Sequence, residues 1–150
     1  MASTFVRATN TGVGFITHED RIGFTLQGVS DDIYEVSGDY QAWRDRVGGV
    51  ELSALEATAL LNGALVATYT KALETLYDQQ AQAKRYDNRL TFALRAGYAG
   101  PYQAEALAFA TWMDACNVYG YTQMARVIAA ERALPTIEEF IAELPALVYP

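Results

Sequence analysis

The fold of this chain is decided by residues 53–85, SALEATALLNGALVATYTKALETLYDQQAQAKR. Ala, Leu, Glu, Gln and Lys dominate the segment, no proline interrupts it and Gly63 is its single glycine, so residue propensity predicts one long helix. Ser53 and Glu56 have the spacing of a capping box, in which hydroxyl and carboxylate each satisfy a free amide at the helix start. The helix is therefore expected to begin after Ser53 and to run to about residue 85.

One face of this predicted helix carries residues at alternating four- and three-residue steps, which is the seam of a left-handed coiled coil. Its members are Leu55, Ala59, Asn62, Val66, Tyr69, Leu73 and Leu76, with Ala83 one turn beyond Gln80. A polar Asn62 in such a seam is typical of a residue that fixes register. A second stripe of Leu61, Leu65 and Ala72, with Thr68, leaves open the alternative that the helix packs on the chain's own C-terminal helices.

The residues before this helix are predicted to form β-structure, because short β-branched runs alternate with turn residues. Candidate strands cover residues 4–8, 13–17, 22–26 and 33–36 and would form a small antiparallel meander. A short helix over residues 40–47 is expected to end at Gly48 and Gly49.

The residues after residue 85 are predicted to be helical. Asp87 is placed to cap a short helix, Pro101 to begin a long one, and Thr136 with Glu139 to form a capping box for a closing helix that Pro145 ends. The long helix has an apolar face of Ala106, Phe109, Ala110, Met113, Asn117, Gly120, Met124 and Val127. The predicted fold class is α+β: a β-rich lobe over residues 1–50, followed by a helical module with two long helices over residues 51–150.

Composition narrows the class of protein. The chain has 150 residues, of which 51% are hydrophobic, enough for one domain or two small lobes. Its 18 acidic and 11 basic residues give a net charge of −7, which disfavours nucleic acid and anionic membranes as partners. The single cysteine cannot form an intrachain disulfide, and no signal peptide or membrane span is recognisable, so a soluble cytoplasmic protein is expected.

Candidate chemical sites are weak. His18 lies in a polar turn with no nucleophile placed beside it, and Cys116 lies beside an apolar helix face where thiols act as small hydrophobes. The neighbours Asp31 and Asp32 supply too few oxygen ligands for a calcium loop, and the glycines of residues 12–14 precede a strand instead of a helix. We therefore expect no catalytic residue, no metal site and no cofactor.

A cluster of cations stands out in this acidic chain. It consists of Lys84, Arg85, Arg89 and Arg95. Such a cluster favours either contact with an acidic protein surface or simple solvation near the end of a helix, where cations stabilise the helix dipole. Ten tyrosines along the chain add side chains that suit partly hydrated interfaces.

The C-terminal half, about residues 81–145, resembles a helical module of tail-fibre and other tail proteins of tailed bacteriophages. Four stretches carry the likeness: RYD at residues 85–87, YAGPYQAEA at 98–106, FATWMDAC at 109–116, and the ending that runs from LPT at 134–136 to ELP at 143–145. The resemblance implies a tail or tail-assembly role, with other tail proteins as partners, a location in the virion after assembly in the host cytoplasm, and no catalytic residues.

The resemblance leaves two roles open: a subunit retained in the tail, and an assembly chaperone that is released. The long regular helix favours the retained subunit. Likeness to fibre proteins also implies a homo-oligomer, with a trimer favoured, through the seam described above. An enzyme that degrades cell wall is the alternative from another class, but the sequence offers no paired nucleophile and base and no acid pair at usable spacing.

Overall fold

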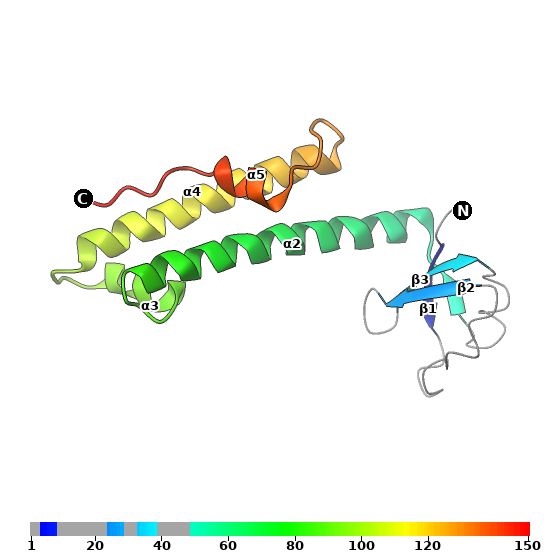
Figure 1. Ribbon diagram of the computed structural model, residues 1–150, viewed down its shortest axis with the longest axis horizontal. Helices are drawn as coiled ribbons and strands as arrows, with labels where there is room; N and C mark the ends of the chain where they lie inside the picture. Colours follow the sequence, from blue (N-terminus) through cyan, green and yellow to red (C-terminus); the bar gives the residue numbers. More distant parts are fainter. Residues whose placement is uncertain (1–3, 9–23, 29–32, 39–48) are drawn as a thin grey trace. The chain divides into compact units, whose positions relative to one another are not determined.

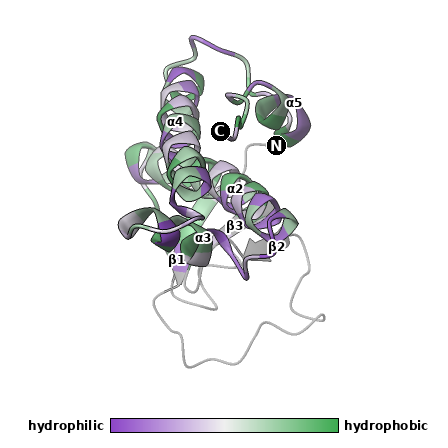
Figure 2. Cartoon of the chain, turned by 90° about the vertical axis from the view of Figure 1, so that its left-hand side faces the viewer, coloured by the Kyte–Doolittle hydropathy of each residue, from purple (hydrophilic) through white to green (hydrophobic). Residues whose placement is uncertain are grey.

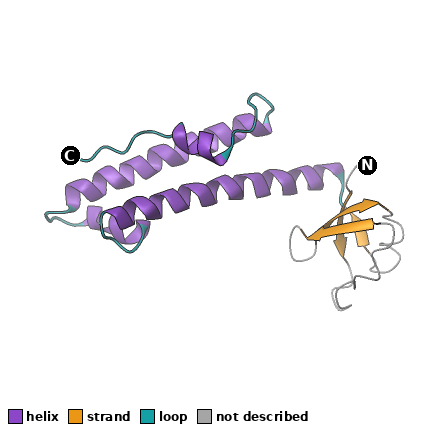
Figure 3. Cartoon of the chain, in the orientation of Figure 1, coloured by secondary structure: helices purple, strands orange, loops and turns teal. Residues whose placement is uncertain are grey.

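The computed structural model describes residues 4–8, 24–28, 33–38 and 49–150. The chain divides into two compact units, Met1–Leu61 and Asn62–Pro150. The sequence predicted a boundary at residue 50; the division instead falls inside the long helix α2 (Ala54–Ala83), which begins in the first unit and continues in the second. Figure 3 shows strands in the N-terminal part followed by helices, and the α+β fold class is confirmed.

The first unit contains a four-stranded antiparallel sheet. Its strands are β1 (Thr4–Ala8), β2 (Phe24–Gly28), β3 (Ile33–Gly38) and β4 (Gly49–Glu51). The spatial order is β2-β3-β1-β4, so β1 lies between β3 and β4 and the order differs from that of a simple meander. Three of the predicted strands are present, at β1, β2 and β3.

Two predicted elements of this unit, the strand over residues 13–17 and the helix over residues 40–47, lie outside the described residues. Strand β4 was not predicted. Its three residues are too few to show a period-2 pattern in the sequence. Gly49 of this strand pairs with Ala8 of β1.

The sheet buries apolar side chains of its two central strands. Val6 of β1 and Val36 of β3 are almost fully buried, and Ile33 and Leu52 are buried with little exposure. The amide of Leu52 donates to the carbonyl of Phe5 over 2.8 Å, which continues the pairing of β4 with β1 up to the start of α2.

Helix α2 begins as the sequence predicted. The backbone amide of Ser53 donates to Glu56 Oε2 over 2.9 Å, and the amide of Glu56 donates to Ser53 Oγ over 3.3 Å, which completes the capping box. The helix ends in a Schellman motif, with Arg85 in the left-handed conformation at φ 67°. In this motif the amide of Tyr86 donates to the carbonyl of Ala81 over 3.0 Å.

Two short helical segments follow, α3 (Arg89–Ala93) and the 3₁₀ helix η2 (Leu94–Gly97). The sequence assigned the cap of α3 to Asp87, and this was wrong by one residue. Asn88 is the cap: its side chain accepts from the amides of Leu90 and Thr91.

The remaining helices are α4 (Gln103–Ile128) and α5 (Ile137–Ala142). Helix α4 begins two residues after Pro101, which lies in the preceding turn instead of at the first helical position. The predicted capping box of Thr136 and Glu139 is confirmed, with the Thr136 amide donating to Glu139 Oε2 over 2.8 Å. Figure 1 shows α4 beside α2, with α5 and the C-terminal segment along α4.

The second unit has a continuous hydrophobic core drawn from all of its helices. Phe92 of α3 stacks on Phe109 of α4 with 4.4 Å between ring centroids, and both rings are fully buried. Gly120 permits close packing, because a Cβ atom there would lie 3.1 Å from Leu73 Cδ1 and 3.3 Å from Phe140 Cζ. Figure 2 shows that α2, α4 and α5 each combine hydrophobic with hydrophilic residues, as helices with one buried side do.

Truncating the core tests this packing. Phe109→Ala should lower the free energy of unfolding by about 3–5 kcal/mol, because the fully buried ring leaves a cavity. Leu107→Ala is the matched control, since Leu107 lies on the exposed side of α4, and should change stability by less than about 1 kcal/mol. Chemical denaturation of both variants measures the difference; equal small losses would contradict the assignment of the buried face.

A second prediction concerns the end of α4. Ala130 has φ 58°, a conformation that costs a side-chain-bearing residue energy and costs glycine none. Ala130→Gly should therefore raise the free energy of unfolding by about 0.5–1 kcal/mol, whereas Ala125→Gly inside the helix should lower it by about 1 kcal/mol. Thermal unfolding of the two variants compares them, and a loss of stability with Ala130→Gly would show that the left-handed conformation assigned to Ala130 is wrong.

Candidate interaction surfaces

The structure divides the predicted seam of α2 into two parts. Tyr69 and Leu73 are buried in the core of the second unit, and Val66 and Leu76 pack against that core while partly exposed. These residues contact helices of their own chain. The seam residues at the start of α2 differ, because Leu55 has an exposed fraction of 80%.

Ala59 is also exposed, and Asn62 is half-buried. At its start the seam can therefore offer Leu55, Ala59 and Asn62 to another chain.

Tyr69 is tied into the fold by its polar end as well as its ring. The hydroxyl donates a hydrogen bond to the carbonyl of Pro135, and the ring meets Phe140 edge to face with 5.0 Å between centroids. A contact that joins α2 to the segment before α5 serves the internal packing of this unit. The seam pattern alone could not distinguish it from an interface between chains.

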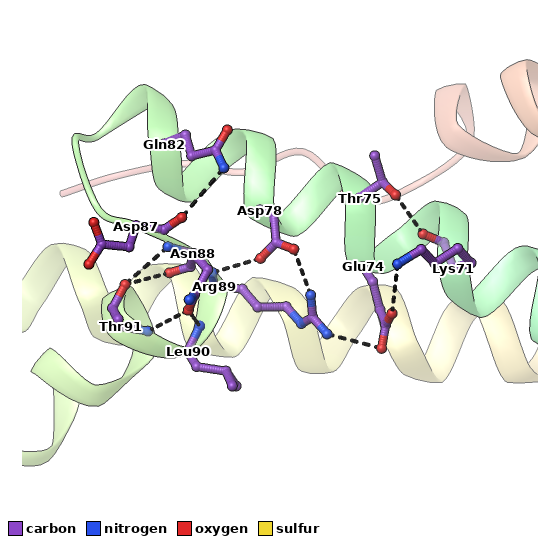
Figure 4. Close-up of polar contacts among 10 residues, drawn as sticks. All are labelled: Lys71, Glu74, Thr75, Asp78, Gln82, Asp87, Asn88, Arg89, Leu90 and Thr91. Carbon is purple, nitrogen blue, oxygen red and sulfur yellow. Dashed lines mark hydrogen bonds and ion pairs between the residues drawn. The ribbon is translucent and has the colours of Figure 1, made fainter.

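The cation cluster is also divided. Arg89 is half-buried between two carboxylates of α2: its Nη1 lies 2.7 Å from Asp78 Oδ2 and its Nη2 lies 3.0 Å from Glu74 Oε1. The backbone amide of Arg89 donates to the other oxygen of Asp78 over 2.9 Å (Figure 4). Arg89 therefore attaches α3 to α2.

Lys84 has internal partners too. Its Nζ lies 3.2 Å from Glu105 Oε2 and 4.1 Å from the centroid of the Tyr149 ring, which the C-terminal segment places against it. The Tyr86 hydroxyl donates to the other oxygen of Glu105 over 3.2 Å. Burial is the main cause that raises the pKa of Tyr86, and this hydrogen bond raises it further. Lys84 and Glu105 thus link the end of α2 to the start of α4.

Arg85 and Arg95 remain at the surface. Arg85 is exposed, and no ion pair with it occurs among residues 49–150 or the described strands. Arg95 donates a hydrogen bond to the Tyr98 hydroxyl, and its guanidinium carbon lies 5.6 Å from the centroid of that ring. Both cations belong to a segment that also exposes large apolar side chains: Leu90, Leu94, Tyr98 and Tyr102.

The interior of the second unit does not activate its thiol. Cys116 is fully buried, and burial raises the pKa of the thiol to about 11, so that it is protonated at neutral pH. Burial also raises the pKa of Tyr77, whose hydroxyl donates to Asn117 Oδ1 over 3.0 Å. These groups serve packing and internal hydrogen bonding.

The described helices enclose a small hollow. A hollow of about 10 Å³ between α2, α4 and α5, bordered by Val66, Asn117 and Tyr121, has room for about one water molecule. Within the described ranges no group of three or more His, Cys, Asp or Glu side chains is placed to hold a metal ion. No described helix is long and apolar enough to cross a membrane.

Several residues weighed in the sequence, His18, Asp31, Asp32 and the glycines of residues 12–14, lie outside the described residues. The structure adds one cluster that sequence reasoning missed. Arg132 Nη2 lies 2.6 Å from Glu143 Oε2, and its Nη1 donates to Gln123 Oε1 over 2.6 Å, so that it joins α4 to the end of α5. Hydrogen bonds from Arg132 hold the pKa of Glu143 below its usual value.

Comparisons of the chain with protein-family models, with curated proteins and with solved structures gave no match.

The internal role of Arg89 can be measured directly. Arg89→Met keeps much of the aliphatic side chain and removes both ion pairs, and should lower the free energy of unfolding by about 1–2 kcal/mol because the pairs are partly screened by solvent. Arg85→Met, the control, should change it by less than about 0.5 kcal/mol. Equal effects of the two substitutions on urea denaturation would place Arg89 among the exposed cations.

Proposed function

We propose that this chain is a structural component of a bacteriophage tail that acts through contacts with other tail proteins and through self-association. The proposal draws on the resemblance of residues 81–145 to tail proteins. The resembling stretches supply Phe109 and Trp112 of the core and the Thr136 cap of α5. Some of the residues that carry the likeness thus help to build the second unit.

The observation that carries the proposal is the exposure of large apolar side chains close together in the segment before α4. Leu90 and Leu94 each have an exposed fraction of 70%, and Tyr102 has 56%. Contiguous exposed apolar patches mark sites of contact with other proteins.

The retained-subunit and chaperone roles differ in where the protein is found, and mass spectrometry of purified virions distinguishes them. A tail subunit should be present in a fixed ratio to the other tail proteins, with loss of tails or fibres when its coding sequence is deleted. Presence in the infected-cell lysate with absence from the purified particle would contradict the subunit role and support the alternative of a released assembly chaperone.

Self-association through the exposed start of the seam is a separate proposal, with a trimer favoured. Leu55→Asp should abolish a trimer held by the seam without unfolding the chain, because the exposed leucine contributes little to the chain's own core. Ala64→Asp lies on the opposite face of the same helix and should leave the mass unchanged. Light scattering with circular dichroism measures both; a wild-type chain that stays monomeric at high concentration would contradict the seam.

A further inference from the structure

Two connections in the second unit lie at opposite ends of α4. The segment of residues 84–102 precedes the helix and carries α3, and the segment of residues 129–139 follows it and leads into α5 (Figure 1). Helix α4 has 26 residues, so at 1.5 Å per residue the two ends are about 39 Å apart. We call these segments the α3 end and the α5 end.

The α3 end is basic in an acidic chain. Its four cations and one carboxylate give a formal charge of +3, against −7 for the whole chain. Ion pairs with α2 and α4 occupy Arg89 and Lys84, which leaves Arg85 and Arg95 exposed. Beside these cations stand the apolar side chains of Leu90 and Leu94, 70% exposed each. This end thus combines positive charge with apolar area.

The α5 end has the opposite charge and a similar apolar content. Its three carboxylates and one cation give a formal charge of −2. The cation, Arg132, is bound to Glu143 and Gln123, while Glu131 and Glu138 are exposed and have no ion pair among the described residues. Leu134 at 56% and Ile137 at 36% exposure supply the apolar area.

We propose that the second unit associates head to tail, with the α3 end of one copy against the α5 end of the next. The two ends of one chain are too far apart to meet, so their complementary charges can be paired by a second copy. A contact between two α3 ends would bring the exposed Arg85 and Arg95 of both copies together, and a contact between two α5 ends would do the same with Glu131 and Glu138, which opposes a symmetric dimer. A contact between unlike ends repeats, and it produces a ring or a filament.

This inference deepens the proposed function, since it names a partner for the exposed apolar residues, but its test uses the purified full chain alone. A protein that stays in the virion and does not self-associate would overturn the head-to-tail contact and leave the tail role standing. A chain that self-associates head to tail but is absent from virions would support the contact and contradict the role as a tail subunit.

Two charge-reversal variants form the experiment. The α3 variant carries Arg85→Glu and Arg95→Glu, and the α5 variant carries Glu131→Lys and Glu138→Lys; all four positions are exposed. Asp114→Lys, on an exposed position in the middle of α4, is the control. Circular dichroism and thermal unfolding establish that each chain folds, and neutral Gln substitutions at the same positions replace any variant that does not.

Sedimentation velocity over a concentration series measures association. The wild type and the control should associate, and raising the salt from about 50 to 500 mM should weaken association by about tenfold, because exposed charges are screened. Each reversal variant alone should lose this salt-dependent association, since its two ends now have the same sign, whereas any trimer formed by the start of α2 should remain. A 1:1 mixture of the variants should associate again, because every contact in it joins opposite charges.

Other outcomes overturn the contact. Wild-type monomers at high concentration would do so. Association of both variants as strong as that of the wild type would assign self-association to another surface, such as the start of α2. Association of the α5 variant alone would indicate a symmetric contact between α3 ends, and failure of the folded variants to associate on mixing would show that the charges of these ends do not face one another.

Discussion

The second unit depends on the stack of Phe92 on Phe109. Phe92 lies between Tyr86, at 4.2 Å between ring centroids, and Phe109, at 4.4 Å, so that three aromatic rings join the end of α2, the short helix α3 and the start of α4. A five-residue helix has little stability of its own. The buried stack and the ion pairs of Arg89 together fix the position of α3. They thereby also fix the positions of the exposed cations and leucines around that helix.

Sequence periodicity and capping chemistry predicted much of the fold. The start of α2 at Ser53 and of α5 at Thr136 followed from capping boxes, which are local and therefore readable. Strand β4 was missed because three residues carry too little pattern, and its pairing with β1 joins residues more than forty positions apart.

The candidate surfaces were harder to predict than the elements. The heptad pattern of α2 correctly identified an apolar face, but it could not say that Tyr69 and Leu73 pack on α4 and α5 of the same chain while Leu55 stays exposed. The cation cluster was likewise treated as one surface, although Arg89 and Lys84 have carboxylate partners at 2.7 and 3.2 Å. Both distinctions depend on contacts between distant residues, which spacing along the chain does not encode.

The second unit draws its hydrophobic core from a single chain, and large apolar side chains stay exposed at its ends. Hydrogen exchange on a dilute solution tests this origin of the core most directly, because at low concentration contacts between chains are lost and internal ones remain. The account predicts the slowest amides in α2 around Leu73 and Tyr77 and in α4 around Phe109 and Cys116, at every concentration. Amides there that exchange rapidly in dilute solution and become protected only on concentration would contradict it.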